Sequence, residues 1–298
     1  MTISTGTEWE AIGTQRGLSG ERVFTIDAPS IGPERHAPLL VLHGFPTSSF
    51  DYAAVLDGLR KGRRVLLLDM VGYGLSSKPD RAYSIALQAD VATAFVAALG
   101  VERLALLTHD MGDTVGGELL ARRAEGTWAV EVTQRVLTNG SIYIDQAHLT
   151  NGQQLLLSLP DEVLPSGIPI DVASITQSLR ETFSPLTAAV PDGWAADPVP
   201  EAAAQVVRSD GQLLLPRLIR YIEERRANER RFTGAIETDP SPLHVVWGLD
   251  DPVAVPSMVD TLVAARPDAT AIRLEGVGHY PMVEAPQRFL DAVLPGLD

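Results

Sequence analysis

The sequence predicts an α/β fold in which a mostly parallel, eight-stranded sheet is flanked by helices and carries an inserted helical cap. Short, almost continuously apolar runs alternate with helical patterns at both ends of the chain, as expected of strands covered on both faces. Between residues 141 and 238 this alternation stops, and only helical patterns and a Pro- and Gly-containing loop remain. We therefore expect residues 1–140 and 239–298 to form an α/β core, and residues 141–238 to form the cap.

Eight segments have the length and apolar character of strands. They are residues 9–12, 22–27, 38–43, 64–69, 104–107, 135–138, 243–247 and 270–274. Helical apolar stripes follow most of them, and Ser84 and Gly100 are placed to begin and end one such helix. The cap has helical patterns of its own, at residues 151–159, 171–183, 201–208 and 213–231.

Composition excludes several classes of protein. The 298 residues are 45% hydrophobic, which suffices for a large core, and the formal net charge is -14. A nucleic-acid or anionic-membrane partner is not expected from so acidic a chain. Because there is no Cys, the sequence excludes disulfides, a thiolate catalyst and a Cys-ligated metal. Residues 1–10 lack the apolar core of a signal peptide, and no apolar run reaches about 18 residues, so we expect a cytoplasmic protein.

Asp110 occupies the centre of a strand–turn–helix motif, Leu104-Ala-Leu-Leu-Thr-His-Asp-Met-Gly-Asp113. This is the context of a nucleophile elbow, in which a sharp turn presents a side chain, usually Ser, to the substrate. A carboxylate that attacks an acyl carbon gives an anhydride, a poor intermediate, whereas attack on an sp3 carbon gives an ester that water can cleave. Asp110 therefore indicates an epoxide or an alkyl halide as substrate, unless it is merely a surface turn residue of a plain α/β fold.

Two further residues with side chains suited to catalysis, Asp251 and His279, each follow one of the last two predicted strands. Because ligands of parallel α/β sheets bind beyond the carboxyl ends of the strands, Asp110, Asp251 and His279 can converge there. We choose Asp251 over Asp250 as the acid because Asp251 directly precedes Pro252 in the turn. The three residues then form a nucleophile, an acid and a base in that chain order.

The turn His43-Gly-Phe-Pro46 fits the same plan. The backbone N–H groups of Phe45 and of Met111, the residue after the nucleophile, are placed to form an oxyanion hole. The Phe45–Pro46 peptide bond is expected to be cis, as a tight turn favours. His43 and His109 are expected to be structural, because neither lies where a general base is needed.

These motifs resemble the α/β-hydrolase fold family, in the branch of epoxide hydrolases and haloalkane dehalogenases that use an Asp nucleophile. The turn at 43–46 resembles the oxyanion motif of epoxide hydrolases, and the segment 109–112 resembles their elbow. The sequence resembles the mesoderm-specific transcript-like hydrolases of this branch still more closely. The similar segments are residues 108–113, 119–120, 220–222 and 278–281. The resemblance covers essentially the whole chain outside the cap and implies a hydrolase that works without a cofactor or a metal.

The resemblance also implies roles for cap residues. Epoxide hydrolases use cap tyrosines to protonate the epoxide oxygen, and Tyr221 resembles the second of these. Tyr143, just after the sixth strand, is the candidate for the first, with a packed aromatic at the cap hinge as an equal alternative. Trp194, in the cap loop, is a candidate substrate-binding residue. The dehalogenases hold the leaving halide with side-chain N–H donors, but the matching positions are Met111 and Phe45, which have none.

The sequence therefore favours hydrolysis of an epoxide to a diol, with a small hydrophobic substrate and no nucleic-acid or membrane partner. Asp110 attacks, Tyr221 protonates the oxygen, and His279, oriented by Asp251, activates water to cleave the ester. The alternatives are a haloalkane dehalogenase with an altered halide site and a weakly active binding or regulatory protein of the same fold. A complete triad argues against the last alternative, because a binding protein has no need of both Asp251 and His279. The oligomeric state stays open.

Overall fold

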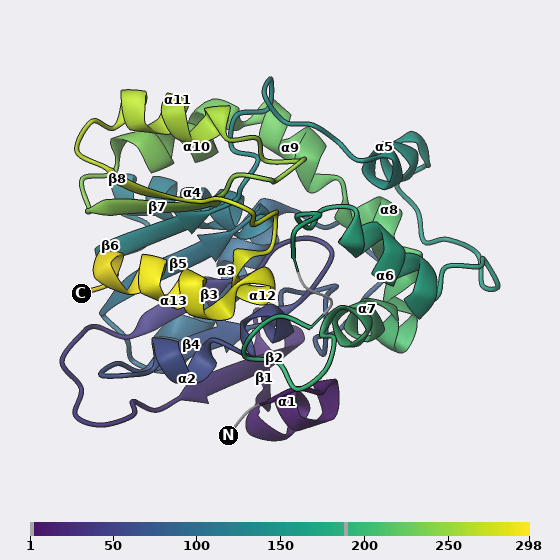
Figure 1. Cartoon of the computed structure of the whole chain (residues 1–298), viewed down its shortest axis with the longest axis horizontal. Helices are drawn as coiled ribbons and strands as arrows, with labels where there is room; N and C mark the ends of the chain where they lie inside the picture. Colours follow the sequence, from purple (N-terminus) through teal and green to yellow (C-terminus); the bar gives the residue numbers. More distant parts are fainter. Residues whose placement is uncertain (1–2, 188–189) are drawn as a thin grey trace.

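The computed structural model describes residues 3–187 and 190–298, which form an eight-stranded sheet in the order β1-β2-β4-β3-β5-β6-β7-β8 (Figure 1). β2 is antiparallel to both of its neighbours, and the pairings among β3 to β8 are parallel. The mostly parallel α/β sheet predicted from the sequence is confirmed. The strands are β1 (Thr14–Leu18), β2 (Glu21–Ala28), β3 (Leu39–Leu42), β4 (Val65–Leu68), β5 (Arg103–His109), β6 (Glu131–Thr138), β7 (Leu243–Gly248) and β8 (Thr270–Leu274).

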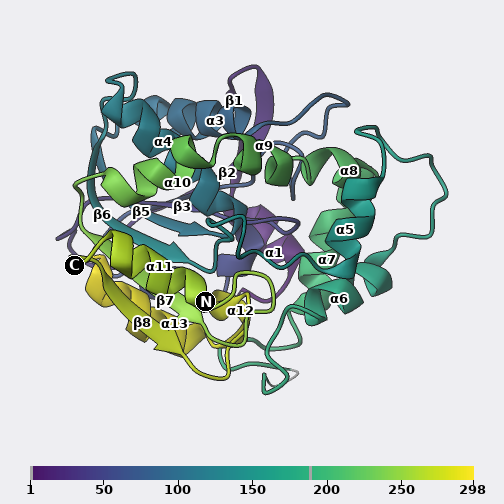
Figure 2. The same cartoon turned by 90° about the horizontal axis from the view of Figure 1, so that it is seen from above.

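Helices cover both faces of the sheet. In Figure 1, α2 (Leu56–Leu59) and α13 (Pro286–Val293) lie on the near face. Figure 2 shows α3 (Ile85–Ala98), α4 (Met111–Ala124) and α10 (Glu229–Thr238) on the opposite side of the sheet from α13. The other core elements are α1 (Gly6–Ile12), α11 (Ser257–Ala265), α12 (Pro281–Glu284) and 3-10 turns at Ser49–Tyr52 and Leu294–Gly296. Among the residues described, none of the helices combines the length and apolar character that crossing a bilayer requires.

The sheet brings the carboxyl ends of its parallel strands to one edge. Pairing aligns Leu42 of β3 with Thr108 of β5, and His109 of β5 with Thr138 of β6. β3, β4 and β7 are buried along their full length, as their continuous apolar sequences predict. Residues that follow β3, β5, β6, β7 and β8 therefore meet at that edge, which faces the cap helices in Figure 1.

The N-terminal segment differs from the prediction. Residues 9–12, predicted as a strand, belong to helix α1, and the first strand is β1 instead. Thr5 accepts a hydrogen bond from the N–H of Glu8, and the Glu8 carboxylate accepts one from the N–H of Thr5, which together form a capping box. This local signal outweighs the short apolar pattern around Trp9, whose ring packs edge-on against Phe50 in the core.

Between residues 141 and 238 the described residues form helices and loops, without a strand. The cap elements are α5 (Asn151–Ser158), α6 (Val172–Arg180), α7 (Val199–Val207), a 3-10 turn (Arg208–Leu214), α8 (Leu215–Leu218) and α9 (Tyr221–Ala227). The single helix predicted at 213–231 is divided, and Asn228, with φ -125° and ψ 23°, separates α9 from α10. α10 lies on the core rather than over the strand ends, since the backbone of Phe232 packs closely on Gly117 of α4. The division of the chain into core and cap stays a prediction.

Candidate active site

The turn between β5 and α4 holds Asp110 in a strained backbone conformation. Asp110 has φ 50° and ψ -114°, a region that residues other than glycine rarely adopt. The neighbouring chain passes very close to this turn. A Cβ atom on Gly44 would lie 2.6 Å from the Cβ of Asp110, and one on Gly112 would lie 2.3 Å from the carbonyl oxygen of Leu42. Glycine at these two positions therefore allows the turn that presents the Asp110 side chain beyond the end of the sheet.

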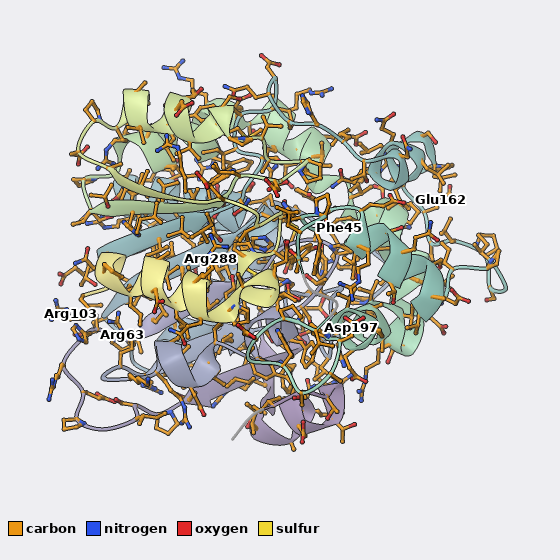
Figure 3. All side chains as sticks on the ribbon, viewed as in Figure 1. Phe45, Arg63, Arg103, Glu162, Asp197 and Arg288 are labelled. Atoms are coloured by element: carbon orange, nitrogen blue, oxygen red, sulfur yellow. The ribbon has the colours of Figure 1, made fainter. Side chains whose placement is uncertain are left out.

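The Asp110 carboxylate is buried, with 2% of the residue exposed, and it meets two groups. The Phe45 N–H donates a hydrogen bond to Oδ2 at 2.8 Å, and His279 Nε2 lies 4.0 Å from Oδ1. Figure 3 places Phe45 between the sheet and the cap helices. The peptide bond from Phe45 to Pro46 is cis, as predicted. The Met111 N–H, at the first position of α4, makes no hydrogen bond to the Asp110 carboxylate, so one of the two predicted oxyanion donors contacts it.

His279 is oriented by Asp251 on its other side. His279 Nδ1 lies 2.8 Å from Asp251 Oδ2, which also accepts a hydrogen bond from the side-chain amide of Asn139 at 2.8 Å. The other carboxylate oxygen, Oδ1, accepts hydrogen bonds from the N–H groups of Val253 at 2.7 Å and Ala254 at 3.0 Å. Both oxygens of Asp251 are thus held by donors, which fixes the direction in which the His279 ring points.

Of the two candidate acids, Asp251 is the one in contact with His279. Asp250 is half-buried and instead accepts a hydrogen bond from the Ser184 hydroxyl at 2.5 Å. Asp110, His279 and Asp251 therefore lie next to one another, as their places after three strands predict, and Asp250 has a separate contact with Ser184.

Charge around His279 sets its protonation in the resting site. Burial acts to lower the pKa of the imidazole, but the charge and hydrogen bond of Asp251, together with the charge of Asp110, outweigh burial and raise that pKa to about 9. His279 is therefore a cation between two carboxylates at neutral pH. Any step that neutralises Asp110 removes part of this stabilisation and lowers the pKa of His279.

The rings of His43 and His109 both contact backbone groups. His43 Nδ1 lies 2.8 Å from the carbonyl oxygen of Gly44, and its Nε2 accepts the Met70 N–H at 2.9 Å. His109 Nε2 lies 2.8 Å from the carbonyl oxygen of His279. Burial is the main cause that lowers the pKa of both rings, which keeps them neutral. These contacts agree with the structural role predicted for both residues.

Tyr221, at the start of α9, is buried between the cap and the core. Its ring centroid lies 5.7 Å from that of Phe45, the residue whose N–H binds Asp110. Burial and then the charge of Asp110 raise the pKa of Tyr221 above its ordinary value, and Arg225 opposes this shift. The Tyr221 hydroxyl makes no hydrogen bond to a described residue. Tyr221 lines a small cavity of about 10 Å³ together with Tyr73, Met111 and Leu218.

Tyr143 and Trp194 have other partners, and the structure does not bring them to Asp110. The Tyr143 hydroxyl donates a hydrogen bond to Glu237 Oε1 at 2.8 Å, as a packed aromatic at the cap hinge would. The Trp194 indole N–H donates to the carbonyl oxygen of Val283 at 3.1 Å, and its ring packs against Phe50. Both polar groups are thus occupied by protein partners, and the predicted substrate contacts of Tyr143 and Trp194 are not supported by the geometry.

A cavity of about 90 Å³ lies between the cap and the core and reaches His279. Its walls are mostly apolar, with Leu156, Ile175 and Leu179 from the cap and Phe45 from the core. Of the predicted site residues, Phe45 and His279 line it, whereas Asp110, Tyr221, Tyr143 and Trp194 do not. An apolar cavity of this size suits a small hydrophobic molecule or a short alkyl chain. The described residues contain no group of three or more His, Cys, Asp or Glu side chains arranged to hold a metal ion.

Three residues that hold the site were not predicted from the sequence. Asn139, which directly follows β6 and has φ 46°, donates a hydrogen bond to Asp251. The glycine after it, Gly140, indicates in the sequence that this turn is tight. Glu284 accepts hydrogen bonds from backbone N–H groups on both sides of His279. Arg225 reaches from the cap to the elbow. The roles of Glu284 and Arg225 depend on contacts distant in sequence, for which the sequence offers no local signal.

Comparison with known proteins shows how far the similarity extends. A model of the family described as the alpha/beta hydrolase family matches residues 39–292. LipZ of Mycobacterium tuberculosis is 35% identical over 99% of this chain and 98% of LipZ. The mesoderm-specific transcript homolog protein of Homo sapiens is 31% identical over 96% of this chain and 86% of that protein. Among solved structures, the epoxide hydrolase CorEH without ligand superposes with a TM-score of 0.69 over 95% of this chain and 97% of that chain, at 17% identity.

Proposed function

The chain belongs to the alpha/beta hydrolase family, and within it we propose an enzyme that hydrolyses epoxides to diols through an ester on Asp110. The observation that carries the proposal is the set of contacts around the Asp110 carboxylate. One oxygen accepts the Phe45 N–H, and the other lies 4.0 Å from the His279 imidazole. A carboxylate held this way, in a strained turn beneath an apolar cap, is arranged as a nucleophile for an alkyl carbon.

The first half-reaction joins the substrate to the enzyme. An oxygen of Asp110 attacks one carbon of the epoxide ring and forms the ester bond, while the ring C–O bond to that carbon breaks. The ring oxygen takes the proton of the Tyr221 hydroxyl, which becomes a phenolate. The position of Tyr221 against Phe45 and its unshared hydroxyl support this role.

The second half-reaction releases the diol. Alkylation neutralises Asp110, so the pKa of His279 falls, and the proton that His279 releases restores the Tyr221 hydroxyl. The neutral ring then removes a proton from water, which attacks the ester carbonyl, and the N–H groups of Phe45 and Met111 hold the oxygen that becomes negative. When the ester bond breaks, the departing diol oxygen takes the proton from His279. The carboxylic proton left on Asp110 returns to His279, which restores the resting charges.

An epoxide fits this site better than an alkyl halide. A leaving halide is stabilised by N–H donors and needs no proton, but the side chains of Met111 and Phe45 carry no N–H. The Met111 sulfur instead accepts a hydrogen bond from the Tyr73 hydroxyl at 3.3 Å. A leaving epoxide oxygen needs a proton, and a phenol at the position of Tyr221 can give one.

Trapping the ester tests the proposal. In the His279→Gln variant the first half-reaction proceeds and the second stops, so incubation with 1,2-epoxyhexane should add the mass of one epoxide to the protein. Intact-protein mass spectrometry measures the adduct, and peptide mapping should locate it on Asp110. Wild-type enzyme should release the diol, and Asp110→Asn should give neither adduct nor diol.

Incubation with 1-bromohexane, an alkyl halide of the same chain length, distinguishes an epoxide hydrolase from a haloalkane dehalogenase. Release of bromide together with no diol from the epoxide would establish a dehalogenase and contradict the proposal. An unmodified mass for His279→Gln with both compounds, although each binds, would exclude the covalent mechanism and leave a protein that binds without turnover.

A further inference from the structure

Arg225 is a buried cation that reaches from the cap into the nucleophile elbow. It lies on α9, four residues after Tyr221, so the two side chains share one face of the helix. The residue is 1% exposed, and its guanidinium carbon lies 5.0 Å from the centroid of the Tyr221 ring. This distance is within the range of a cation–π interaction, which strengthens when both groups are removed from water.

The guanidinium also contacts three points around Asp110. Its Nε donates to the Thr114 hydroxyl, in the first turn of α4, at 2.7 Å. Its Nη1 donates to the carbonyl oxygen of Ser141, at the start of the cap, at 2.8 Å, and its Nη2 lies 3.5 Å from the carbonyl oxygen of Asp110. One side chain therefore connects the helix that carries Tyr221, the elbow and the exit from β6.

The charge of Arg225 is held in an unusual way. Its hydrogen-bond acceptors are neutral, and no carboxylate among the described residues lies within ion-pair distance of it. A buried charge without a paired counter-ion is costly, and structures normally avoid it. The positive charge instead faces the ring of Tyr221, which lies close enough to Asp110 for the charge of that carboxylate to raise the pKa of the phenol. A group that becomes an anion at this place would add a favourable interaction to those that Arg225 already has with the carboxyl groups of Asp113 and Glu229, which lie beyond ion-pair distance.

We propose that Arg225 is a positioning residue for epoxide opening, which holds the Tyr221 phenol against the elbow and stabilises the phenolate left when Tyr221 gives its proton to the ring oxygen. The inference rests on the proposed function, because it needs Tyr221 as the acid. The bonds change as described for the first half-reaction: the Asp110 ester bond forms, the ring C–O bond breaks and the phenol proton moves to the ring oxygen. Arg225 exchanges no proton in this step, since guanidinium stays charged.

The test measures ester formation alone, in the His279→Gln background. The protein is mixed with 1,2-epoxyhexane, the reaction is quenched at short times, and the ester is quantified by intact-protein mass spectrometry. Arg225→Met should slow ester formation by ~10- to 100-fold, because a preorganised charge beside the acid is lost. Arg226→Met, at the exposed neighbouring position, should leave the rate unchanged. Arg225→Lys, which keeps the charge but not the fork, should give an intermediate rate.

A second background separates catalysis from mere support of the fold. In Tyr221→Phe no phenolate forms, so adding Arg225→Met should cause little further slowing. Equal slowing by Arg225→Met in both backgrounds would show a structural role alone and overturn the inference, as would no slowing at all. If Arg225→Met does not fold, the same comparison with Arg225→Lys decides in the same way. Absence of any ester in His279→Gln would instead defeat the proposed function, and the Arg225 inference with it.

Discussion

Asp110 and His279 change each other's charge during the proposed cycle. In the resting site the carboxylate of Asp110 helps to raise the pKa of His279 to about 9, beside the larger effect of Asp251. A cationic imidazole cannot remove a proton from water. Ester formation removes the Asp110 charge, so the base becomes available only after the nucleophile has been used.

This coupling predicts the pH dependence of ester hydrolysis. The neutral fraction of His279 in the alkyl-enzyme should increase with pH, so the rate should rise and then level off below about pH 9, because the pKa is lower in the ester than in the free enzyme. Single-turnover experiments from pH 5.5 to 9.5, with mass spectrometry of the decaying ester, measure this profile. A rate that is constant or that falls with pH over this range would contradict the role of His279 as base.

Among single residues, the sequence was sufficient to predict that Asp110, Asp251 and His279 meet at one edge of the sheet, and their roles stay a prediction. Each directly follows a strand that its apolar run identifies, and parallel pairing brings strand ends together whatever lies between them. Arg225 could not be found this way. It lies on an amphipathic cap helix where an arginine ordinarily faces water, and its burial depends on how α9 meets the elbow.

The short helix α12 connects the cap to the loop that carries His279. The Glu284 carboxylate, at its end, accepts hydrogen bonds from the N–H groups of Gly278 at 2.9 Å and Tyr280 at 2.9 Å, on either side of His279. It also accepts the Ser184 N–H at 2.8 Å and the Thr187 hydroxyl at 2.7 Å, both in the cap. One buried carboxylate thus satisfies four donors from two segments.

Glu284→Gln should loosen this connection. The amide nitrogen cannot accept a hydrogen bond, so at least one buried N–H is left without a partner, and unfolding free energy should fall by about 1–3 kcal/mol. Because the loop then holds His279 less firmly, ester hydrolysis should slow by ~10-fold or more, while ester formation changes less. Urea unfolding and the single-turnover assay measure the two effects. Glu275→Gln, at an exposed position of the same loop, is the matched control, and equal effects of both variants would refute this role of Glu284.

Secondary structure elements were predictable where apolar periodicity and tertiary context agree. The buried strands β3, β4, β5 and β7 were found because both of their faces are covered. α1 was missed because four residues around Trp9 satisfy a strand pattern as well as a helical one, and the capping box before them decides between the two. The interruption between α9 and α10 could not be predicted, because no proline or glycine lies there in the sequence.

Across the whole molecule, the cap is joined to the core through many polar contacts. The backbone N–H of His279 donates a hydrogen bond to the carbonyl oxygen of Thr182 at 3.0 Å, and the Arg225 side chain donates one to the Thr114 hydroxyl. On the far side of the sheet, Arg231 of α10 pairs with Glu118 of α4 at 2.6 Å. The first two contacts link the predicted cap to the core at buried residues, whereas the third holds α10, which itself lies on the core, against α4. Separation of the predicted cap from the core would therefore break contacts of His279 and of the turn that carries Asp110.

The molecule should accordingly unfold in one cooperative transition. Trp194 reports on the cap, whereas Trp9, Trp128 and Trp247 are buried in the core. Urea unfolding curves from tryptophan fluorescence should coincide with those from far-ultraviolet circular dichroism, both in the wild type and in Trp194→Phe. Two separated transitions, with the first lost in Trp194→Phe, would show that the cap unfolds independently.

The strained turn at Asp110 does not depend on the chemical nature of the side chain that it presents. Room for the turn comes from Gly44 and Gly112, and the carboxylate itself has no part in creating that room. Another short side chain at position 110 would therefore emerge in the same direction and meet the same Phe45 N–H and the same imidazole. A hydroxyl there would favour attack on acyl carbon rather than alkyl carbon. The same main chain can thus present either kind of side chain, without any rebuilding of the turn.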